Sequence, residues 1–109
     1  MKLFTKAILN KLPTLEATAE TSTADSKVIC KFFGGNGTWY ITAYDPAEKL
    51  AFGFVNLGDP VCAEMGYISI TELEKLRIPP FGLGVERDRS FKPMPLQKII
   101  DIVKNGGHV

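Results

Sequence analysis

Residues 28–44 read VICKFFGGNGTWYITAY, and this stretch decides the fold. Val28 to Phe33 is rich in β-branched and aromatic residues, which favour extended strands. Gly34 to Gly37 follows at once, with glycine and asparagine, the residue types that supply the positive φ angles of hairpin turns. Thr38 to Tyr44 has the composition of a returning strand. The stretch therefore predicts a β-hairpin.

Alternation along the returning strand predicts which side chains share a face. Trp39, Ile41 and Ala43 fall on one face, and Tyr40, Thr42 and Tyr44 fall on the other. Exposed aromatic rings on a sheet form a stacking platform for single-stranded nucleic acid, whereas buried rings serve core packing. Both interpretations of Trp39 and Tyr40 stay open on the sequence.

Further strands are expected downstream of the hairpin. Leu50 to Leu57 and Met65 to Ile70 are both mainly apolar, and the breaker sequence Gly58-Asp59-Pro60 separates them. Gly53 inside the first of them predicts a bulge or a close approach of two backbones. Val85 to Asp88 adds an edge strand. These segments together predict an antiparallel meander of four to five strands.

Three helices are expected around this sheet. Residues 2–12 carry apolar side chains at three- and four-residue spacing before Pro13. A short middle helix is expected to begin at Thr71, which would form a capping box with Glu74. Leu96 to Val103 has one apolar stripe and predicts a C-terminal helix. The fold class is therefore α+β, a single antiparallel sheet with an N-terminal, a short middle and a C-terminal helix packed on it.

The length of 109 residues suits a single domain over residues 1–109. The apolar fraction of 45% and the charged fraction of 23% are those of an ordinary globular protein, which excludes disorder of the whole chain. Within this domain, residues 14–26 have no apolar period and predict a mobile loop. Residues 105–109 predict a flexible tail.

Neither membrane insertion nor secretion is indicated. No apolar run approaches the ~20 residues that a membrane span requires. The first residues lack the apolar segment of a signal peptide. Cys30 and Cys62 share no metal-ligand or redox spacing, so we expect two reduced thiols in a cytoplasmic protein.

No motif for catalysis, metal binding or cofactor binding stands out. His108 is the only histidine and lies in a Gly-flanked tail, which does not suit a rigidly held triad. One histidine and two distant cysteines predict no zinc site. The acidic neighbours Asp59 and Glu64 are expected to raise the pKa of the Cys62 thiol rather than activate it. We therefore expect no cofactor and no metal, and we assign no catalytic residue.

The densest polar cluster is Glu86-Arg87-Asp88-Arg89. In one interpretation Arg87 or Arg89 clamps a phosphate or a carboxylate, because arginine presents a planar fork of donors. In the other interpretation the cluster is a set of ion pairs that keeps an exposed strand edge from pairing with another chain. The sequence leaves open whether this cluster lines a pocket or lies flat on the surface.

The net charge of +1 is unevenly distributed. Residues 1–74 carry six Lys/Arg and nine Asp/Glu, net −3, whereas residues 75–109 carry seven and three, net +4. A basic C-terminal third attracts phosphate backbones in some proteins and is a solvated face in others. The candidates for phosphate contacts are Arg77, Arg87, Arg89 and Lys92.

Short motifs spread along the chain are together typical of one family. They are Lys2-Leu3-Phe4-Thr5-Lys6, Lys11-Leu12-Pro13, Val28 to Phe33, Thr38-Trp39-Tyr40, Tyr44-Asp45, Phe52-Gly53, Glu64-Met65-Gly66-Tyr67-Ile68-Ser69, Glu72-Leu73-Glu74, Phe81-Gly82-Leu83, Glu86-Arg87-Asp88 and Phe91-Lys92-Pro93. Through them the chain resembles domain of unknown function 2958, a family of short bacterial proteins. The Glu-Arg-Asp and Glu-x-Gly-Tyr segments are the most specific parts of this resemblance.

The resemblance implies no established activity. It does imply a setting, since such proteins look like passengers of plasmids and integrative elements, sometimes beside antirestriction or DNA-processing proteins. Ala43 stands where the family often has an acidic residue, which argues against a carboxylate acting at that position.

The function expected from these observations is that of a non-enzymatic accessory protein of a bacterial mobile element. It would act by binding a host or element-encoded protein, with counter-defence as one such role. The expected surface combines Glu64 and Tyr67 with Phe81 and the cluster at residues 86–89, a mixture of aromatic and arginine side chains that interfaces favour.

Two alternatives stay open. The first is a nucleic-acid-binding module that uses Trp39, Tyr40 and the basic residues of the C-terminal third. The second is an enzyme that uses Glu86 and Asp88 as its carboxylates.

Overall fold

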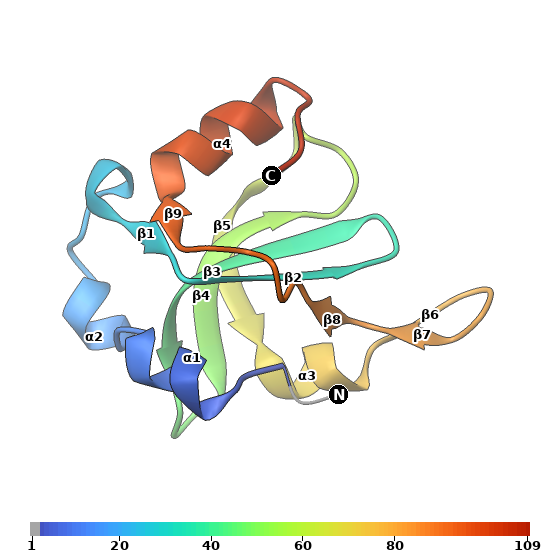
Figure 1. The fold of residues 1–109 in the computed structure, drawn as a ribbon, viewed down its shortest axis with the longest axis horizontal. Coiled ribbons are helices and arrows are strands. Elements are labelled where there is room, and N and C mark those ends of the chain that lie inside the picture. Colours follow the sequence, from blue (N-terminus) through green and yellow to red (C-terminus); the bar gives the residue numbers. More distant parts are fainter. Residues whose placement is uncertain (1–2) are drawn as a thin grey trace.

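Five strands form one antiparallel sheet in the computed structural model, which describes residues 3–109 (Figure 1). Their order across the sheet is β5-β4-β3-β2-β8, so the first four are a meander and the last adds an edge. This arrangement confirms the predicted α+β class. The strands of this sheet are β2 (Cys30–Gly34), β3 (Gly37–Asp45), β4 (Leu50–Asn56), β5 (Glu64–Ser69) and β8 (Glu86–Arg87).

The remaining elements are helices and two-residue strands around this sheet. The helical elements are α1 (Lys6–Lys11), α2 (Leu15–Thr18), the 3-10 turn η1 (Thr23–Asp25), α3 (Ile70–Lys75) and α4 (Leu96–Lys104). The short strand pairs are β1 (Lys27–Val28) with β9 (Met94–Pro95), and β6 (Arg77–Ile78) with β7 (Leu83–Gly84).

The central hairpin forms where the sequence predicts it. Gly34 pairs with Gly37, which leaves a two-residue turn. Gly35 takes a φ of +54°, a left-handed conformation that glycine adopts without steric cost. The first strand begins later than predicted, because Ile29 interrupts it. The two residues before Ile29 form β1, which pairs with β9 and not with the main sheet.

A β-bulge at Thr42 changes the faces of β3. The register with β4 shifts between Ile41 and Ala43, so Thr42 is an extra residue in the strand. Its hydroxyl donates to the Phe52 carbonyl oxygen at 3.0 Å. As a result Tyr40 and Tyr44 lie on opposite faces, and the prediction from simple alternation that they share one face is wrong.

Gly53 confirms the predicted close approach of two backbones. It pairs with Ile41 beside the bulge, and a Cβ atom at this position would lie 1.9 Å from the Tyr40 carbonyl oxygen. No side chain fits in that space. The strand centre therefore depends on this glycine.

Both faces of the sheet are buried under helices. On one face, α1 and α3 enclose a core whose largest members include Phe32, Trp39 and Ile41. On the other face, α4 contributes an apolar stripe that packs with Tyr40 and Phe54. Helices therefore cover the sheet from both sides, which leaves its lateral edges as the parts open to other chains.

The N-terminal region differs from the prediction in detail. Helix α1 begins at Lys6, with the Thr5 hydroxyl accepting from the Ile8 amide, and not at residue 2. Lys2, part of the predicted helix, lies outside the described residues. Residues 14–26, expected to be a loop, contain α2 and η1, each opened by a hydroxyl cap from Thr14 or Ser22.

The middle helix begins earlier than the predicted capping box. Ser69 is the N-cap of α3, and its hydroxyl accepts from the Glu72 amide at 3.3 Å. Thr71 and Glu74 therefore do not cap this helix, because both already lie inside it. Ser69 and Glu72 have the same spacing as Thr71 and Glu74, so the hydroxyl cap lies two residues earlier than predicted.

The hairpin β6–β7, an element that the sequence did not predict, projects from the body of the protein (Figure 1). Beyond it the chain forms β8, which is the edge strand expected at Val85 to Asp88. Helix α4 also matches its prediction and buries Leu96, Ile99 and Val103. The chain then returns to the sheet, where the Lys31 amine donates to the Val109 carbonyl oxygen.

Candidate functional site

The outer side of β5 is an open strand edge. β5 is the last strand of the sheet and pairs with β4 alone. The Ile70 amide donates to the Lys49 carbonyl oxygen at 3.0 Å. Because backbone groups alternate in direction along an antiparallel strand, Ile68 and Gly66 also face β4, and Met65 and Tyr67 face away from it. The N–H and C=O groups of Met65 and Tyr67 are therefore presented to the outside.

Apolar side chains gather around this edge. Tyr67 and Leu57 are each 70% exposed, and Leu76 after α3 is also exposed. The Tyr67 ring packs against Phe52 on the neighbouring strand, with 5.0 Å between the ring centroids. We call Leu57, Tyr67 and Leu76 the β5-edge cluster. Its exposure is unusual for large apolar side chains, which soluble proteins scatter singly more often than they group.

Hollows lie on both sides of the edge, and Tyr67 lines each of them. One hollow of about 370 Å³ lies beside α3 and is floored by Trp39, Ile68 and Leu73. Another of about 410 Å³ lies on the α4 side and is lined by Phe52, Met65 and Leu96, together with residues of α2 and η1. The edge is thus a ridge of backbone between two shallow pockets.

The rim of the edge is acidic. Asp59 and Glu64 line a third hollow of about 300 Å³, and Glu72 lines the hollow beside α3. The exposed Cys62 thiol donates to the Asp59 carboxylate at 3.4 Å. This hydrogen bond, the charge of Asp59 and, to a lesser degree, the charge of Glu64 raise the pKa of the Cys62 thiol. The effect of these neighbours on the thiol was predicted from the sequence and is confirmed.

The surface expected from the sequence is split by the topology. Glu64 and Tyr67 lie on β5, whereas Glu86 and Arg87 lie on β8, at the opposite end of the strand order. Phe81 is 82% exposed at the tip of the β6–β7 hairpin, which projects from the β8 side of the sheet (Figure 1). The prediction that these residues form one continuous surface is therefore wrong.

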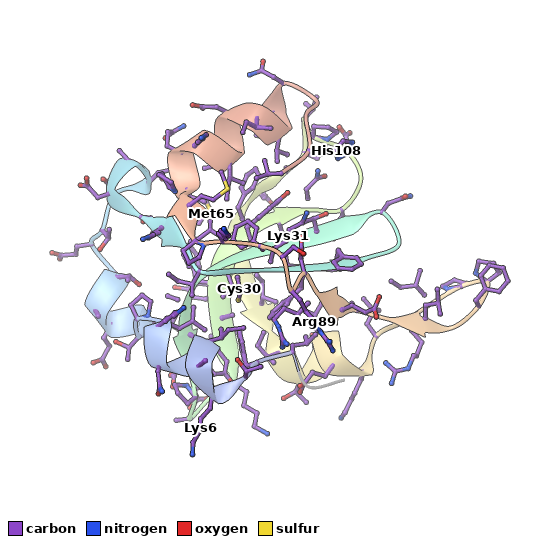
Figure 2. All side chains as sticks on the ribbon, in the orientation of Figure 1. Lys6, Cys30, Lys31, Met65, Arg89 and His108 are labelled. Atoms are coloured by element: carbon purple, nitrogen blue, oxygen red, sulfur yellow. The ribbon has the colours of Figure 1, made fainter. Side chains whose placement is uncertain are left out.

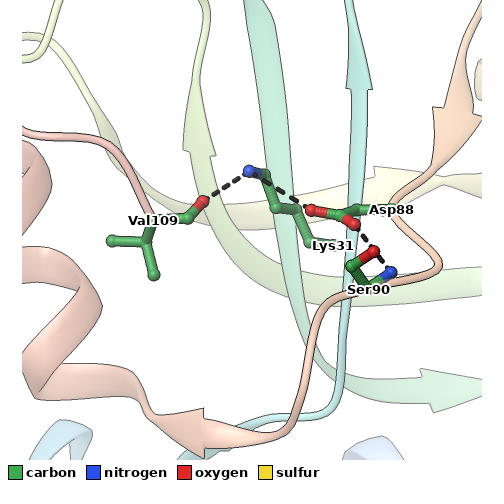
Figure 3. A network of polar contacts seen from close by, with 4 residues as sticks. All are labelled: Lys31, Asp88, Ser90 and Val109. Carbon is green, nitrogen blue, oxygen red and sulfur yellow. Dashed lines mark hydrogen bonds and ion pairs between the residues drawn. The ribbon is translucent and has the colours of Figure 1, made fainter.

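The cluster at residues 86–89 makes mainly internal contacts. The Arg87 guanidinium donates to the Leu3 carbonyl oxygen at 2.9 Å. The Asp88 carboxylate lies 3.7 Å from the Lys31 amine and accepts from the Ser90 amide at 2.9 Å (Figure 3). The Lys31–Asp88 contact favours the ion-pair interpretation for Asp88, whereas Arg87 is held by its hydrogen bond to a backbone carbonyl. Arg89 is exposed (Figure 2).

Glu86 lies apart from this network. It is exposed and lines a hollow of about 400 Å³ together with Phe33, Arg77 and Leu83. The Arg77 guanidinium already donates to the carbonyl oxygens of Glu74 and Leu76, at 3.1 and 2.8 Å.

The aromatic platform for nucleic acid is not formed. Trp39 is 7% exposed and Tyr40 is 3% exposed, and they belong to the cores on opposite faces of the sheet. Neither ring can stack on a base in this conformation. Of the basic residues in the same hypothesis, Arg89 and Lys92 are exposed, whereas Arg87 is tied to Leu3.

Cys30, the first residue of β2, is buried in the core on the α1 and α3 face of the sheet (Figure 2). Burial raises the pKa of its thiol to about 12, against a smaller opposing effect of Arg87. Such a thiol stays protonated and unreactive at neutral pH. Within residues 3–109, no three His, Cys, Asp or Glu side chains come together as a metal site, and no helix there is long and apolar enough to cross a membrane.

Sequence reasoning missed two members of the β5-edge cluster, Leu57 and Leu76. Leu57 was counted as a strand residue, and Leu76 follows α3 directly. In the structure both are the first residues beyond an element, a position that the sequence did not reveal.

The chain matches a family model over residues 3–109, with the description "Protein of unknown function (DUF2958)". It belongs to this family. No curated protein and no solved structure matches the chain. The match of the DUF2958 model runs to residue 109, so it includes α4 and the segment after it.

Proposed function

We propose that this DUF2958 protein is a non-enzymatic accessory protein of a bacterial mobile element that acts in the cytoplasm by binding another protein. The observation that carries the proposal is the β5-edge cluster. It joins three exposed apolar side chains to an unpaired strand edge, between hollows that extend to both faces of the sheet.

The composition of this surface supports a protein as the partner. Interfaces are enriched in tyrosine and large apolar residues, and their central residues fill pockets. Tyr67 is central to this surface, since it lines each of the three hollows at the edge, which side chains of a partner would fill. None of these hollows is lined by a lysine or an arginine, which does not suit a phosphate backbone.

Site-specific crosslinking in bacterial cells that express the protein tests this proposal. A photoreactive benzoylphenylalanine replaces Tyr67, Phe81 or Lys98 in separate variants. Lys98 is an exposed residue of α4 and is the control position. We expect a defined protein adduct at position 67 that is absent at position 98, and a Leu57→Ser change on the same variant should weaken it.

Other outcomes count against the proposal. Equal adducts at positions 67 and 98 would mean that β5 has no special role. An adduct at position 81 alone would move the interface to the β6–β7 hairpin. A gel shift of oligonucleotides that weakens steeply with salt, without any protein adduct, would favour the nucleic-acid alternative.

A further inference from the structure

We propose that the open edge of β5 takes up an extended, cationic segment of the partner protein as a sixth strand of the sheet. The inference rests on the proposed function and specifies the chemistry and conformation of the partner. It is carried by the backbone of β5, by the hollows beside it and by the charges on its rim.

The backbone of β5 offers a complete set of pairing groups. Met65 and Tyr67 direct their N–H and C=O groups away from β4, as the alternation from the Ile70–Lys49 bond requires. An incoming strand can therefore form two pairs of main-chain hydrogen bonds with them. Peptides that add to sheet edges obtain much of their affinity from such bonds.

The edge lacks the features that usually protect exposed strands. Lysine, proline and bulges commonly prevent pairing with other chains. β5 contains no lysine or proline, and its register with β4 is continuous over all six residues. A Cβ atom at Gly66 would meet no atom within 4 Å, so no side chain covers that face of the strand at its middle. The opposite edge, β8, is only two residues long.

The two large hollows suit the side chains of an added strand. Successive side chains of a strand point to opposite faces of the sheet. Here one face presents the hollow floored by Trp39 and Leu73, and the other presents the hollow lined by Phe52 and Leu96. Alternate side chains of the incoming segment can thus enter the two hollows, on either side of Tyr67.

The charges of the rim select a basic segment. Asp59, Glu64 and Glu72 line the hollows along the edge. The Lys104 amine approaches the start of β5 but donates to the carbonyl oxygens of Val61 and Ala63. Lysine or arginine side chains at the ends of the incoming strand would meet the carboxylates, and apolar side chains would occupy the hollows.

A second copy of this chain suits the edge less well. Pairing of β5 with β5 would bring two copies of Glu64 and of Glu72 to one seam. Four carboxylates along one seam, with no lysine or arginine lining the hollows beside it, oppose the pairing. We therefore assign the edge to a foreign segment of opposite charge.

Selection from a library of random peptides of about ten residues tests this assignment. We expect the peptides that bind the wild-type protein to be enriched in Lys/Arg and in β-branched residues. Hydrogen exchange should show new protection of the Met65 and Tyr67 amides in the complex. Enrichment of acidic peptides, or binding without protection of these two amides, would overturn the inference.

Backbone pairing is tested separately from charge. A selected peptide is compared with a version that is N-methylated at alternate residues, which loses its donors on one edge and keeps its charge. We expect the methylated peptide to bind at least about tenfold more weakly. Equal affinity of the two peptides would exclude strand addition.

Charge selection is tested with a matched pair of variants. Glu64→Lys should weaken binding of the cationic peptide by about tenfold or more and shift the selection toward acidic peptides. Glu86→Lys, an equivalent change on the opposite edge, should alter binding less than about twofold. An equal effect of both changes would show only a response to net charge. If these tests fail while the crosslink at position 67 persists, strand addition is wrong and protein binding at β5 stands.

Discussion

The Arg87 guanidinium donates a hydrogen bond of 2.9 Å to the carbonyl oxygen of Leu3, a residue near the other end of the chain. Leu3 is fully buried in the core beneath α1. This bond joins the segment that precedes α1 to the edge strand β8. The Glu-Arg-Asp segment therefore includes a residue that holds the fold together.

Replacement of Arg87 by alanine should destabilise the protein and loosen its N-terminal segment. Loss of a charge-assisted hydrogen bond to a buried carbonyl group costs about 2 kcal/mol. Urea unfolding measures the free energy, and hydrogen exchange should show faster exchange in α1 than elsewhere. The exposed Arg89→Ala is the matched control and should change stability by less than about 0.5 kcal/mol. Equal effects of the two variants would contradict the role of Arg87.

Gly53→Ala should be severely destabilising. The new Cβ atom would lie 1.9 Å from the Tyr40 carbonyl oxygen at the centre of the sheet, so two strands must move apart. We expect a loss of about 3 kcal/mol or more in the free energy of unfolding. Gly66→Ala on β5 is the control, because its Cβ meets nothing within 4 Å. A similar midpoint of thermal unfolding for the two variants would show that the sheet adapts at Gly53.

Alkaline pH should destabilise the protein partly through Cys30. Burial raises the pKa of its thiol from 9.0 to about 12 in the folded state. The unfolded chain therefore loses this proton first, and the stabilisation present below pH 9 declines as the pH rises toward 12, by up to about 1.4 kcal/mol per pH unit. Burial also raises the pKa of Tyr40 and Tyr44, which adds to the decline.

Urea unfolding of the wild type and of Cys30→Ala between about pH 8 and pH 10.5 measures this contribution. The variant should be less stable at every pH, because it leaves a cavity, but its stability should fall less steeply with pH. Parallel curves for the two proteins would show that Cys30 does not contribute to the alkaline decline.

Asp59→Asn should make the Cys62 thiol more reactive. The Asp59 carboxylate accepts from this thiol and is the main cause of its raised pKa, so its removal increases the thiolate fraction. Labelling with a chromogenic disulfide near neutral pH should then be faster, while the buried Cys30 stays silent. Glu64→Gln should have a smaller effect, since Glu64 is the weakest of the named causes. Unchanged labelling of Asp59→Asn would refute the role of its carboxylate.

Local signals in the sequence predicted the elements of the sheet well. The turn at Gly34–Gly37 specifies its own geometry, and the strands beside it have strong strand propensity. The same holds for the apolar stripe of α4. In each case the information lies within a few neighbouring residues, so the prediction did not depend on the rest of the fold.

The candidate site could not be predicted in the same way. Which strand becomes an edge depends on the order of pairing, and that order joins Phe32 to Arg87 across more than half of the chain. Strand composition alone therefore did not show that Tyr67 and Glu86 lie at opposite edges. The distinction between an exposed and a buried Trp39 likewise required the helices α1 and α3 in place.

The extra residue at Thr42 sets the phase of everything that follows it in β3. Tyr40 and Tyr44 are four positions apart, yet they belong to the cores on opposite faces of the sheet. The reason is that Thr42, between them, has no pairing partner on β4. A relative that kept four positions between these rings but paired without the bulge would place its second aromatic ring under α4 instead of α1. The spacing of the two tyrosines and the bulge between them therefore together record how the layers of such a domain are assembled.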